Sequence, residues 1–247
     1  MQVHVIIPSY NEAETLGGLL RDVDRILRGA SYSYQAVVVD DGSTDRTAEV
    51  METLPSSISP RLVRHPRNLG VQEVFRSGFS SVMDHLSDED VVVVAEGDGT
   101  NDPSLLPAML HKIASGADLV GASRFLSGGG YENFPFLRHR LSLAANWTYR
   151  TFFPIPNFSD YTIFYRVYRG ALLRRAWAEH KGRLFESQGF AANIDLLLKV
   201  RPFIRAADQV PHVYRYGTKR GRSKMRVLRN ILANLSLLLK HRSKLGK

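Results

Sequence analysis

Residues 37–47 read VVVDDGSTDRT, an apolar run that stops at two aspartates and a glycine. Two other segments have the same form, VHVIIPSYNE at residues 3–12 and VVVVAEGDG at residues 91–99. A short apolar run bounded by turn residues is typical of a buried strand. The stretches between these runs carry apolar residues at helical spacing, as residues 12–27 do. Strands that alternate with helices predict βαβ units, and therefore an α/β fold with a mostly parallel sheet covered by helices.

The same pattern extends along the rest of the chain. The predicted strands of the first half are Val3–Ile7, Ala36–Val39, Arg61–His65, Val91–Ala95 and Leu119–Gly121. The predicted helices there are Glu12–Leu27, Thr44–Leu54, Val71–Leu86 and Pro103–Ala114. After the glycines at 128–130 the pattern is less regular. It predicts helices at Leu137–Phe152 and Ala191–Val200, strand-like segments at Ile163–Tyr168 and Val210–Tyr216, and an amphipathic helix over residues 225–240.

The positive charge is concentrated at the C-terminal end of the chain. Of 247 residues, 33 are Lys or Arg and 24 are Asp or Glu, a formal net charge of +9. Eleven basic and no acidic residues follow Asp208, which leaves 22 basic and 24 acidic groups in residues 1–208. A basic segment attracts nucleic acid, an anionic membrane surface or an anionic substrate. Because the rest of the chain is slightly acidic, a nucleic-acid-binding module is disfavoured.

Composition excludes several other classes. The chain has no cysteine, which rules out a disulfide scaffold, a Cys-ligated zinc site and a thiol nucleophile. No apolar run approaches the ~20 residues that a membrane span requires. The N-terminal residues MQVHVIIPSY lack the features of a signal peptide.

Polar residues follow three of the predicted strands. They are the segments 8–12, 40–45 and 96–100. Ligands of open α/β sheets bind outside the carboxyl ends of the strands, so we expect these segments to converge on one crevice. A carboxylate there can accept a hydrogen bond from a base or a ribose, and Glu96 with Asp98 can share a divalent cation that bridges a diphosphate. Glycine-rich dinucleotide and Walker-type phosphate motifs are absent from the sequence, which disfavours those two classes.

Four segments together carry a resemblance to a known family. VIIPSYNE (5–12), VVVDDGSTDRT (37–47), RNLG (67–70) and EGDGTNDP (96–103) resemble the inverting family 2 glycosyltransferases of the GT-A fold. Their wording and order resemble the dolichol-phosphate (polyprenyl-phosphate) mannosyltransferase-like branch. The resemblance covers residues 3–125 well and continues more loosely to about residue 224. It implies a metal-dependent hexosyltransferase that uses a nucleoside-diphosphate sugar.

The resemblance implies a role for each donor-side residue. Pro8, Tyr10 and Glu12 would line the nucleotide pocket, and Asp40 would bind the base with Asp41 nearby. Glu96 and Asp98 stand in the place of the family's D-x-D motif, so Mg²⁺ or Mn²⁺ is the implied cofactor and Asp98 is a catalytic candidate. The chain departs from the family by carrying Glu at the first acidic position and Thr100 where glutamine is common.

The acceptor side carries cations that suit a phosphate. Arg124 ends a segment that resembles the family's GSR segment and is a candidate phosphate-binding residue. Arg138 and Ser142 resemble the lipid-phosphate site of this branch in their spacing, and Lys219 and Lys224 fall in a segment resembling its closing loop. Asp160 would contact the sugar or cap the segment that follows it. Asp195 is the candidate base for a hydroxyl acceptor, with a structural salt bridge as the alternative reading.

Two acceptors therefore remain open. A polyprenyl phosphate is already anionic and needs cations but no base, and the basic residues favour it. The alternative is a sugar hydroxyl of a glycan or glycolipid, with Asp195 as base. A degenerate transferase acting as a scaffold is a third possibility, raised by Glu96.

The expected organisation is one GT-A domain over residues 1–224, with a donor half of about 1–125 and an acceptor half of about 126–224. Residues 225–247 form a basic amphipathic segment whose apolar side would lie in a membrane interface or pack on the domain. The first alternative implies a peripheral protein on the cytoplasmic face of a membrane.

Overall fold

The computed structural model describes residues 1–218 and 227–245, so Lys219 and Lys224 lie outside the described residues. Seven of the described strands form one sheet in the order β3-β2-β1-β4-β7-β5-β8, and β6 pairs with β9 in a small second sheet. The strands are β1 Val3–Ser9, β2 Tyr34–Asp40, β3 Arg61–Arg64, β4 Val91–Val94, β5 Leu119–Ser123, β6 Gly130–Glu132, β7 Arg166–Arg169, β8 Ala207–Pro211 and β9 Val213–Arg215. In the large sheet β7 runs antiparallel to both its neighbours, and every other pairing is parallel. The predicted mostly parallel α/β fold is confirmed.

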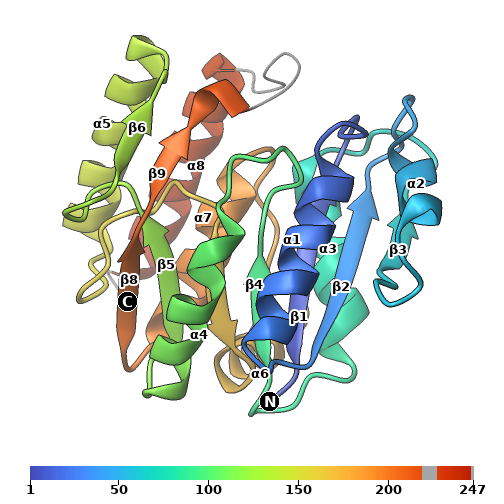
Figure 1. Ribbon diagram of the computed structural model, residues 1–247. Coiled ribbons are helices and arrows are strands. Elements are labelled where there is room, and N and C mark those ends of the chain that lie inside the picture. Colours follow the sequence, from blue (N-terminus) through green and yellow to red (C-terminus); the bar gives the residue numbers. More distant parts are fainter. Residues whose placement is uncertain (219–226, 246–247) are drawn as a thin grey trace.

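Helices cover both faces of the large sheet (Figure 1). They are α1 Leu16–Gly29, α2 Thr47–Val50, α3 Val71–Met83, α4 Leu106–Ala114, α5 Phe136–Phe152, α6 Gly170–Glu179, α7 Ala191–Val200 and α8 Val227–Leu245. One core lies beneath α1 and α4 and contains Val5, Ile7 and Leu20. The other core lies beneath α3, α6 and α7 and contains Phe75 and Phe79. Because both faces are covered, the central strands are apolar at nearly every position.

The helices predicted at Glu12–Leu27 and Thr44–Leu54 begin later than expected. The helix predicted from Glu12 begins at Leu16, because Asn11 has a positive φ of 54° and the Glu12 backbone N–H donates to Thr47 Oγ1 at 2.9 Å. The helix predicted over residues 44–54 is reduced to α2 and a 3-10 turn at Met51–Thr53. In both places side-chain hydrogen bonds between the two loops replace the first helical turn.

The second half departs further from the prediction. The strand predicted over residues 163–168 begins only at Arg166, and the strand predicted over 210–216 is divided at His212 into β8 and β9. The sequence reading missed α6 altogether. Its first residue, Gly170, lies so close to the chain that an added Cβ would come within 2.0 Å of the Ser87 carbonyl oxygen. Strand β7 runs directly into α6 without loop residues, so the sequence contains no separate turn segment that would mark the start of a helix.

Helix α8 packs on the domain along one side and leaves the other exposed. Leu237 is buried against the core, and Tyr149 donates a hydrogen bond to Asn234 Oδ1 at 2.8 Å. Lys240 Nζ lies 3.1 Å from Glu186 Oε2. In contrast Leu232 and Leu239 are 67% and 69% exposed, so packing and an outward apolar face coexist in this helix. Among the described helices, none combines the length and apolar character needed to cross a membrane.

Candidate active site

Three strand ends meet at one edge of the sheet, as the sequence predicts. Strand β1 lies between β2 and β4, so their carboxyl ends are neighbours. The Asp41 backbone N–H donates to the Ser9 carbonyl at 2.9 Å, and the Gly97 N–H donates to the Pro8 carbonyl at 3.2 Å. Tyr10 and Glu12 follow on the same edge. The segments expected to hold a nucleotide are therefore joined by backbone hydrogen bonds.

Asp40 presents a buried carboxylate at this edge. Its Oδ1 accepts a hydrogen bond from the Ser43 backbone N–H at 2.9 Å, and Arg64 Nε lies 3.3 Å from Oδ2 as an ion pair. Within the described residues, Asp40 Oδ2, Ser9 Oγ and Asn101 Nδ2 are buried polar atoms without a hydrogen-bond partner. Buried polar atoms are almost always paired, so this edge has hydrogen-bonding capacity for a ligand.

The carboxylate of Asp41 is hydrogen-bonded to a neighbouring loop of the protein. Its carboxylate accepts hydrogen bonds from the backbone N–H groups of Leu69 and Gly70, both at 2.9 Å, and His65 Nδ1 lies 2.7 Å from Oδ1. Gly42 has φ +67°, and an added Cβ would lie 2.4 Å from the Arg67 carbonyl carbon. Asp41 and Gly42 thus lock the segment 67–70 against the end of β2.

Glu96 and Asp98 follow β4, the first half-buried and the second buried. Asp98 is 4% exposed, and its Oδ1 accepts hydrogen bonds from Thr100 Oγ1 at 2.6 Å and Thr100 N at 3.1 Å. The backbone N–H of Glu96 donates to Asn101 Oδ1 at 2.6 Å. No group of three or more His, Cys, Asp or Glu side chains forms a metal cluster in the described part of the chain. Two carboxylates nevertheless fit a hard divalent cation that takes its remaining ligands from water and a diphosphate.

Arg124 and Asp160 form a buried ion pair on the acceptor side. Arg124 Nε and Nη2 donate to the two carboxylate oxygens at 2.7 and 2.6 Å, and the Arg124 backbone N–H donates to Oδ2 at 3.1 Å. Burial alone would raise the pKa of Asp160, but the charge and hydrogen bonds of Arg124 outweigh it and lower the pKa. Asp160 therefore holds Arg124 in one orientation.

Thr162 connects this ion pair to α5. Its Oγ1 accepts hydrogen bonds from Arg124 Nη2 at 2.7 Å and Asn146 Nδ2 at 2.9 Å, and lies 3.1 Å from Ser142 Oγ. Arg138, one turn before Ser142, donates from Nη1 to the Tyr216 hydroxyl at 3.1 Å. The structure brings Arg124, Arg138 and Ser142 together, as the sequence-based assignment to one site requires.

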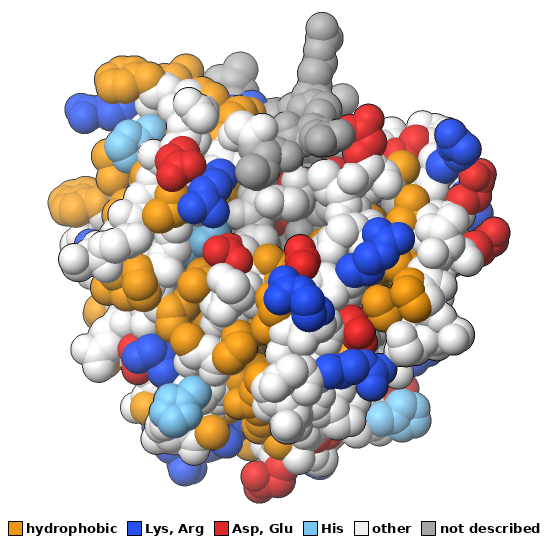
Figure 2. All heavy atoms as spheres, in the orientation of Figure 1, with side chains coloured by type: hydrophobic (Ala, Val, Ile, Leu, Met, Phe, Trp, Pro, Cys, Tyr) orange, Lys and Arg blue, Asp and Glu red, His pale blue; other side chains and the backbone are white. Residues whose placement is uncertain are grey.

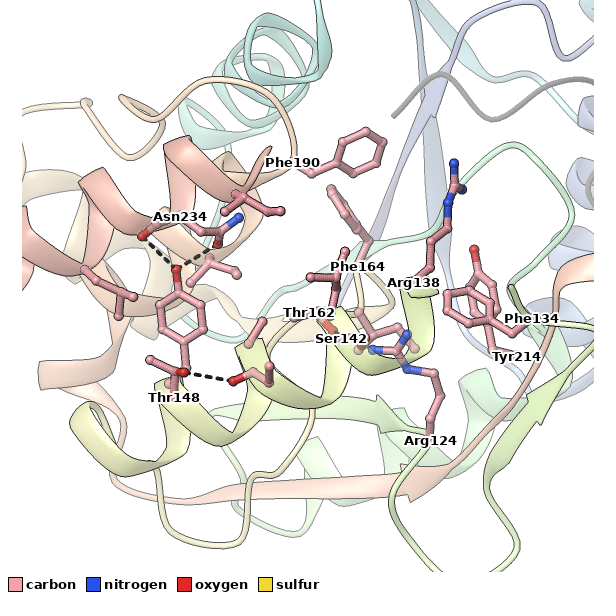
Figure 3. A pocket seen from close by; sticks show the side chains of 18 of the residues that line it. Arg124, Phe134, Arg138, Ser142, Thr148, Thr162, Phe164, Phe190, Tyr214 and Asn234 are labelled. Atoms are coloured by element: carbon pink, nitrogen blue, oxygen red, sulfur yellow. Dashed lines mark hydrogen bonds between the residues drawn. The ribbon is translucent and has the colours of Figure 1, made fainter. Parts of the chain in front are cut away.

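A cavity of about 380 Å³ begins at these polar groups and continues between α5 and α8 (Figure 3). Glu96, Arg124, Arg138 and Ser142 line its polar end. Further along, its walls are apolar and come from the loop before β7 and from α5, α7 and α8. They include Ala144, Ala145, Phe164, Phe190, Ile194, Ile231, Leu235 and Leu238. The arrangement suits a ligand with an anionic head and a long apolar chain.

Asp195 lies outside this cavity. It is fully buried in α7, and its Oδ2 accepts the backbone N–H groups of Glu186 and Ser187 at 2.8 and 2.9 Å. Lys199 Nζ and His241 Nε2 lie 3.4 Å from its carboxylate oxygens. Burial would raise the pKa of Asp195, but hydrogen bonding and Lys199 lower it. The salt-bridge alternative is observed with Lys199 in the same helix, and the contact with His241 ties α7 to α8.

The sequence reading missed the aromatic residues of the cavity. Phe134, Phe190 and Tyr214 all line it. Tyr214 is the second residue of β9 and lies shortly before Lys219 and Lys224, the two residues that the sequence singles out in this part of the chain. His212 and Tyr214 are two residues apart, a spacing that places both on one face of a strand and weakly indicates that the tyrosine faces the site.

Comparisons with known proteins agree with this geometry. The glycosyl transferase family 2 model matches residues 4–181. A dolichol-phosphate mannosyltransferase of Pyrococcus furiosus is 37% identical over 145 residues, 59% of this chain and 39% of that relative. An undecaprenyl-phosphate mannosyltransferase of Micrococcus luteus is 30% identical, and the match covers 85% of this chain and 82% of that relative. This chain thus spans well under half of the Pyrococcus relative.

A solved structure shares the fold across nearly the whole chain. Glucosyl-3-phosphoglycerate synthase from Mycobacterium tuberculosis, in complex with Mn²⁺, uridine diphosphate and glucosyl-3-phosphoglycerate, superposes with a TM-score of 0.65. The match covers 99% of this chain and 80% of that chain at 16% identity. At that identity the likeness establishes the fold alone.

Proposed function

The chain belongs to glycosyl transferase family 2, and from this premise we propose that it transfers a sugar from a nucleoside-diphosphate sugar to a polyprenyl phosphate, with inversion at the anomeric carbon. The cavity is the observation that carries the choice of acceptor. Its polar end holds Arg124, Arg138 and Ser142, and its apolar walls continue between α5 and α8. A glycan acceptor without a lipid would leave such walls unfilled, whereas an isoprenoid chain buries apolar surface there, and the cations at the polar end favour a lipid phosphate over a glycolipid hydroxyl.

On the donor side, we assign the base to Asp40 and the rest of the nucleotide pocket to Pro8, Tyr10, Glu12 and Asp41. The buried Asp40 Oδ2 supports this role, because a base N–H would satisfy it. Within the pocket, Asp41 acts by holding the segment 67–70.

Glu96 and Asp98 would hold a divalent cation, Mg²⁺ or Mn²⁺. When bound, such an ion supplies Lewis-acid stabilisation of the leaving diphosphate. The hydrogen bonds from Thr100 fix the orientation of Asp98, which the fit to a cation requires. The Mn²⁺ and uridine diphosphate held together by the M. tuberculosis synthase support the same choice of group.

The residues on the acceptor side would contribute to the reaction by binding and orienting the acceptor phosphate. Arg124 uses Nε and Nη2 on Asp160 and Thr162, and its Nη1 makes no hydrogen bond to a described residue. That N–H group and Arg138 would orient the acceptor phosphate, and Asp160 would border the sugar pocket. Because a phosphate monoester is anionic at neutral pH, its oxygen can attack the anomeric carbon without a general base. The buried, fully bonded Asp195 is consistent with a reaction that needs none.

Helices α5 and α8 would also dock the protein on a membrane. Exposed apolar side chains of α5 include Phe136, Leu137 and Trp147, and those of α8 include Leu232 and Leu239. Hydrophobic side chains project at the edge of the molecule where α5 lies (Figure 2). Exposed Arg140, Arg150 and Lys240 stand beside them and would meet anionic head groups. A polyprenyl phosphate held between α5 and α8 would then remain partly in the bilayer.

We extend the proposal to the organisation of the chain. Residues 1–125 would bind the donor and residues 126–224 the acceptor, with Lys219 and Lys224 closing over phosphate groups. Residues 225–247 would serve as the basic membrane-facing segment.

The direct test is a donor panel. The protein is incubated with polyprenyl phosphate in detergent, Mg²⁺ or Mn²⁺, and labelled nucleoside-diphosphate sugars. A labelled lipid product that mild acid hydrolyses is the expected result. Transfer to a glycan hydroxyl with no lipid product for any donor contradicts the proposal. Asp98→Asn serves as the inactive control.

A further inference from the structure

Tyr131 contacts two of the residues that line the polar end of the cavity. It lies on β6, opposite Tyr214 of β9 in the small sheet, and it is half-buried. The Arg124 guanidinium carbon lies 4.9 Å from the centroid of the Tyr131 ring, and the Tyr131 hydroxyl lies 3.3 Å from Ser142 Oγ. A cation at this distance over an aromatic face is attracted by the ring. One tyrosine therefore acts on both Arg124 and Ser142.

The Tyr131 ring is held in place by other rings. The centroid of the Phe134 ring lies 4.9 Å from that of Tyr131, and the centroid of the His139 ring lies 4.5 Å from it. His139 belongs to α5, the helix that also carries Ser142. Because closely packed rings have little freedom to change rotamer, these contacts fix the tyrosine against α5.

The available lone pairs determine the direction of the Thr162 hydroxyl. Thr162 Oγ1 accepts hydrogen bonds from Arg124 Nη2 and Asn146 Nδ2, which uses both of its lone pairs, so its own proton must be donated. Ser142 Oγ, at 3.1 Å, is a nearer acceptor for that proton than Asp160 Oδ1, at 3.5 Å. Thr162 therefore donates to Ser142.

Ser142 is in turn left with a proton to donate. A phenol gives up its proton more readily than an aliphatic alcohol, so Tyr131 donates to Ser142 Oγ, as Thr162 does. The Asn146 amide lies 3.4 Å from Ser142 Oγ, but its two protons go to Thr162 Oγ1 and, at 2.7 Å, to the Ser142 carbonyl oxygen. Because both lone pairs of Ser142 Oγ are used and Ser142 lines the cavity, its proton is available to an anion bound there.

We propose that Tyr131 is a positioning residue for the acceptor phosphate: its hydroxyl directs the Ser142 proton into the cavity, and its ring holds the Arg124 guanidinium. The inference rests on the proposed function, which gives the cavity an anionic ligand. It assigns the small sheet of β6 and β9 a part in recognising the phosphate. A polyprenyl phosphate should therefore depend on Tyr131 for binding, and the corresponding polyprenol, which lacks the phosphate, should not.

The test compares the binding of a polyprenyl phosphate and of the corresponding polyprenol to the full chain, in one detergent and without a donor. Tyr131→Phe keeps the ring over Arg124, and we expect it to weaken phosphate binding by about threefold to tenfold, the worth of one hydrogen bond, and to leave polyprenol binding unchanged. Tyr131→Leu also removes the ring and should weaken phosphate binding by a further factor of about two to five. A disturbed cavity would weaken the binding of both lipids alike.

The double variant Tyr131→Phe with Ser142→Ala shows whether the hydroxyl acts through Ser142. If it does, the double variant should bind the phosphate no more weakly than Ser142→Ala alone. Tyr34→Phe is the matched control. Its hydroxyl donates to Asp24 Oδ1 at 2.6 Å, and Tyr34 begins β2, at the end of the strand away from the site. This variant should bind both lipids as the unaltered protein does.

Several outcomes would overturn this inference alone. They are an unchanged preference of Tyr131→Phe for the phosphate, an equal loss of affinity for both lipids, and a double variant that binds the phosphate more weakly than Ser142→Ala. Equal phosphate binding by Tyr131→Phe and Tyr131→Leu would overturn the part assigned to the ring. If the unaltered protein binds the phosphate no better than the polyprenol, the proposed function falls and this inference with it.

Discussion

Arg124 and Asp160 are joined by two parallel hydrogen bonds in the interior, Nε to Oδ2 at 2.7 Å and Nη2 to Oδ1 at 2.6 Å. Their side chains are 6% and 0% exposed. Two charges withdrawn from water in this way depend on each other. The pair therefore determines both the shape of the polar end of the cavity and part of the protein's stability.

Removing one member of this pair should be costly. Asp160→Asn leaves the Arg124 charge buried without its counterion, and we expect a loss of about 3–5 kcal/mol in the free energy of unfolding. Because the pKa of Asp160 is lowered on folding, its stabilisation is present above the unfolded pKa of about 3.9 and is lost as pH falls through the folded value. Urea unfolding at pH 7 and pH 3 measures both effects. An Asp160→Asn protein with an unchanged pH dependence would contradict this account.

Replacing glycine by alanine should have opposite effects on stability at two positions of the chain. Gly42→Ala places a Cβ 2.4 Å from the Arg67 backbone at a residue with φ +67°, so we expect it to destabilise by more than about 1 kcal/mol. Gly18→Ala, in α1 with no atom within 4 Å of the added Cβ, should stabilise by about 0.5–1 kcal/mol. Thermal unfolding distinguishes them. A stabilising Gly42→Ala would show that segment 67–70 is not locked against β2.

Binding at Glu96 and Asp98 should depend on the negative charge of the side chains more than on their length. Asp98→Asn removes a charge while keeping the side-chain shape, and we expect a loss of about 100-fold in transfer rate and of Mn²⁺-dependent diphosphate binding. Glu96→Asp keeps a carboxylate and should retain most of that binding. Calorimetry measures binding apart from turnover. Diphosphate binding that needs no metal and survives Asp98→Asn would favour the scaffold alternative.

Narrowing the cavity should weaken the binding of the lipid acceptor. Ala145 lines the cavity on α5, so Ala145→Phe should raise the KM for polyprenyl phosphate about tenfold by excluding part of the chain. Donor binding should be unchanged. Ala108→Phe, at an exposed position on α4, is the control. An equal change in KM for both variants would argue against a lipid in the cavity.

The outward face of α5 and α8 should bind vesicles. Leu232→Ser and Leu239→Ser each remove an exposed leucine, and each should weaken partition to anionic vesicles by up to about tenfold. Raising the salt concentration should weaken partition further, since the charges are screened. Leu62→Ser, on the edge strand β3, is the matched control. Cosedimentation that is insensitive to both α8 changes would remove the membrane role.

The donor side was predictable because its residues act close to where the sequence places them. Asp40, Glu96 and Asp98 each follow an apolar strand, and parallel strands bring their carboxyl ends to one edge. The acceptor side depends on distant contacts. Lys199 follows Asp195 by one helical turn, so the salt-bridge alternative could be predicted from the sequence, whereas the contacts of Asp195 with the Glu186 backbone and with His241 could not.

The insertion of β7 was not predictable for a related reason. The strand is only four residues long, Arg166–Arg169, and its partners were already assigned to a parallel sheet. Its place between β4 and β5 depends on pairing between residues far apart in the chain, which periodicity does not report.

That place also governs how the chain can be assembled. Val91–Val94 has no partner on its β7 side until residues 166–169 have been synthesised and folded back antiparallel. Until then the protein carries an uncharged valine edge of the kind that pairs with other chains. A fragment that ends before residue 166 would therefore be prone to aggregate, so the strands of the first half depend on the later part of the chain to complete their sheet.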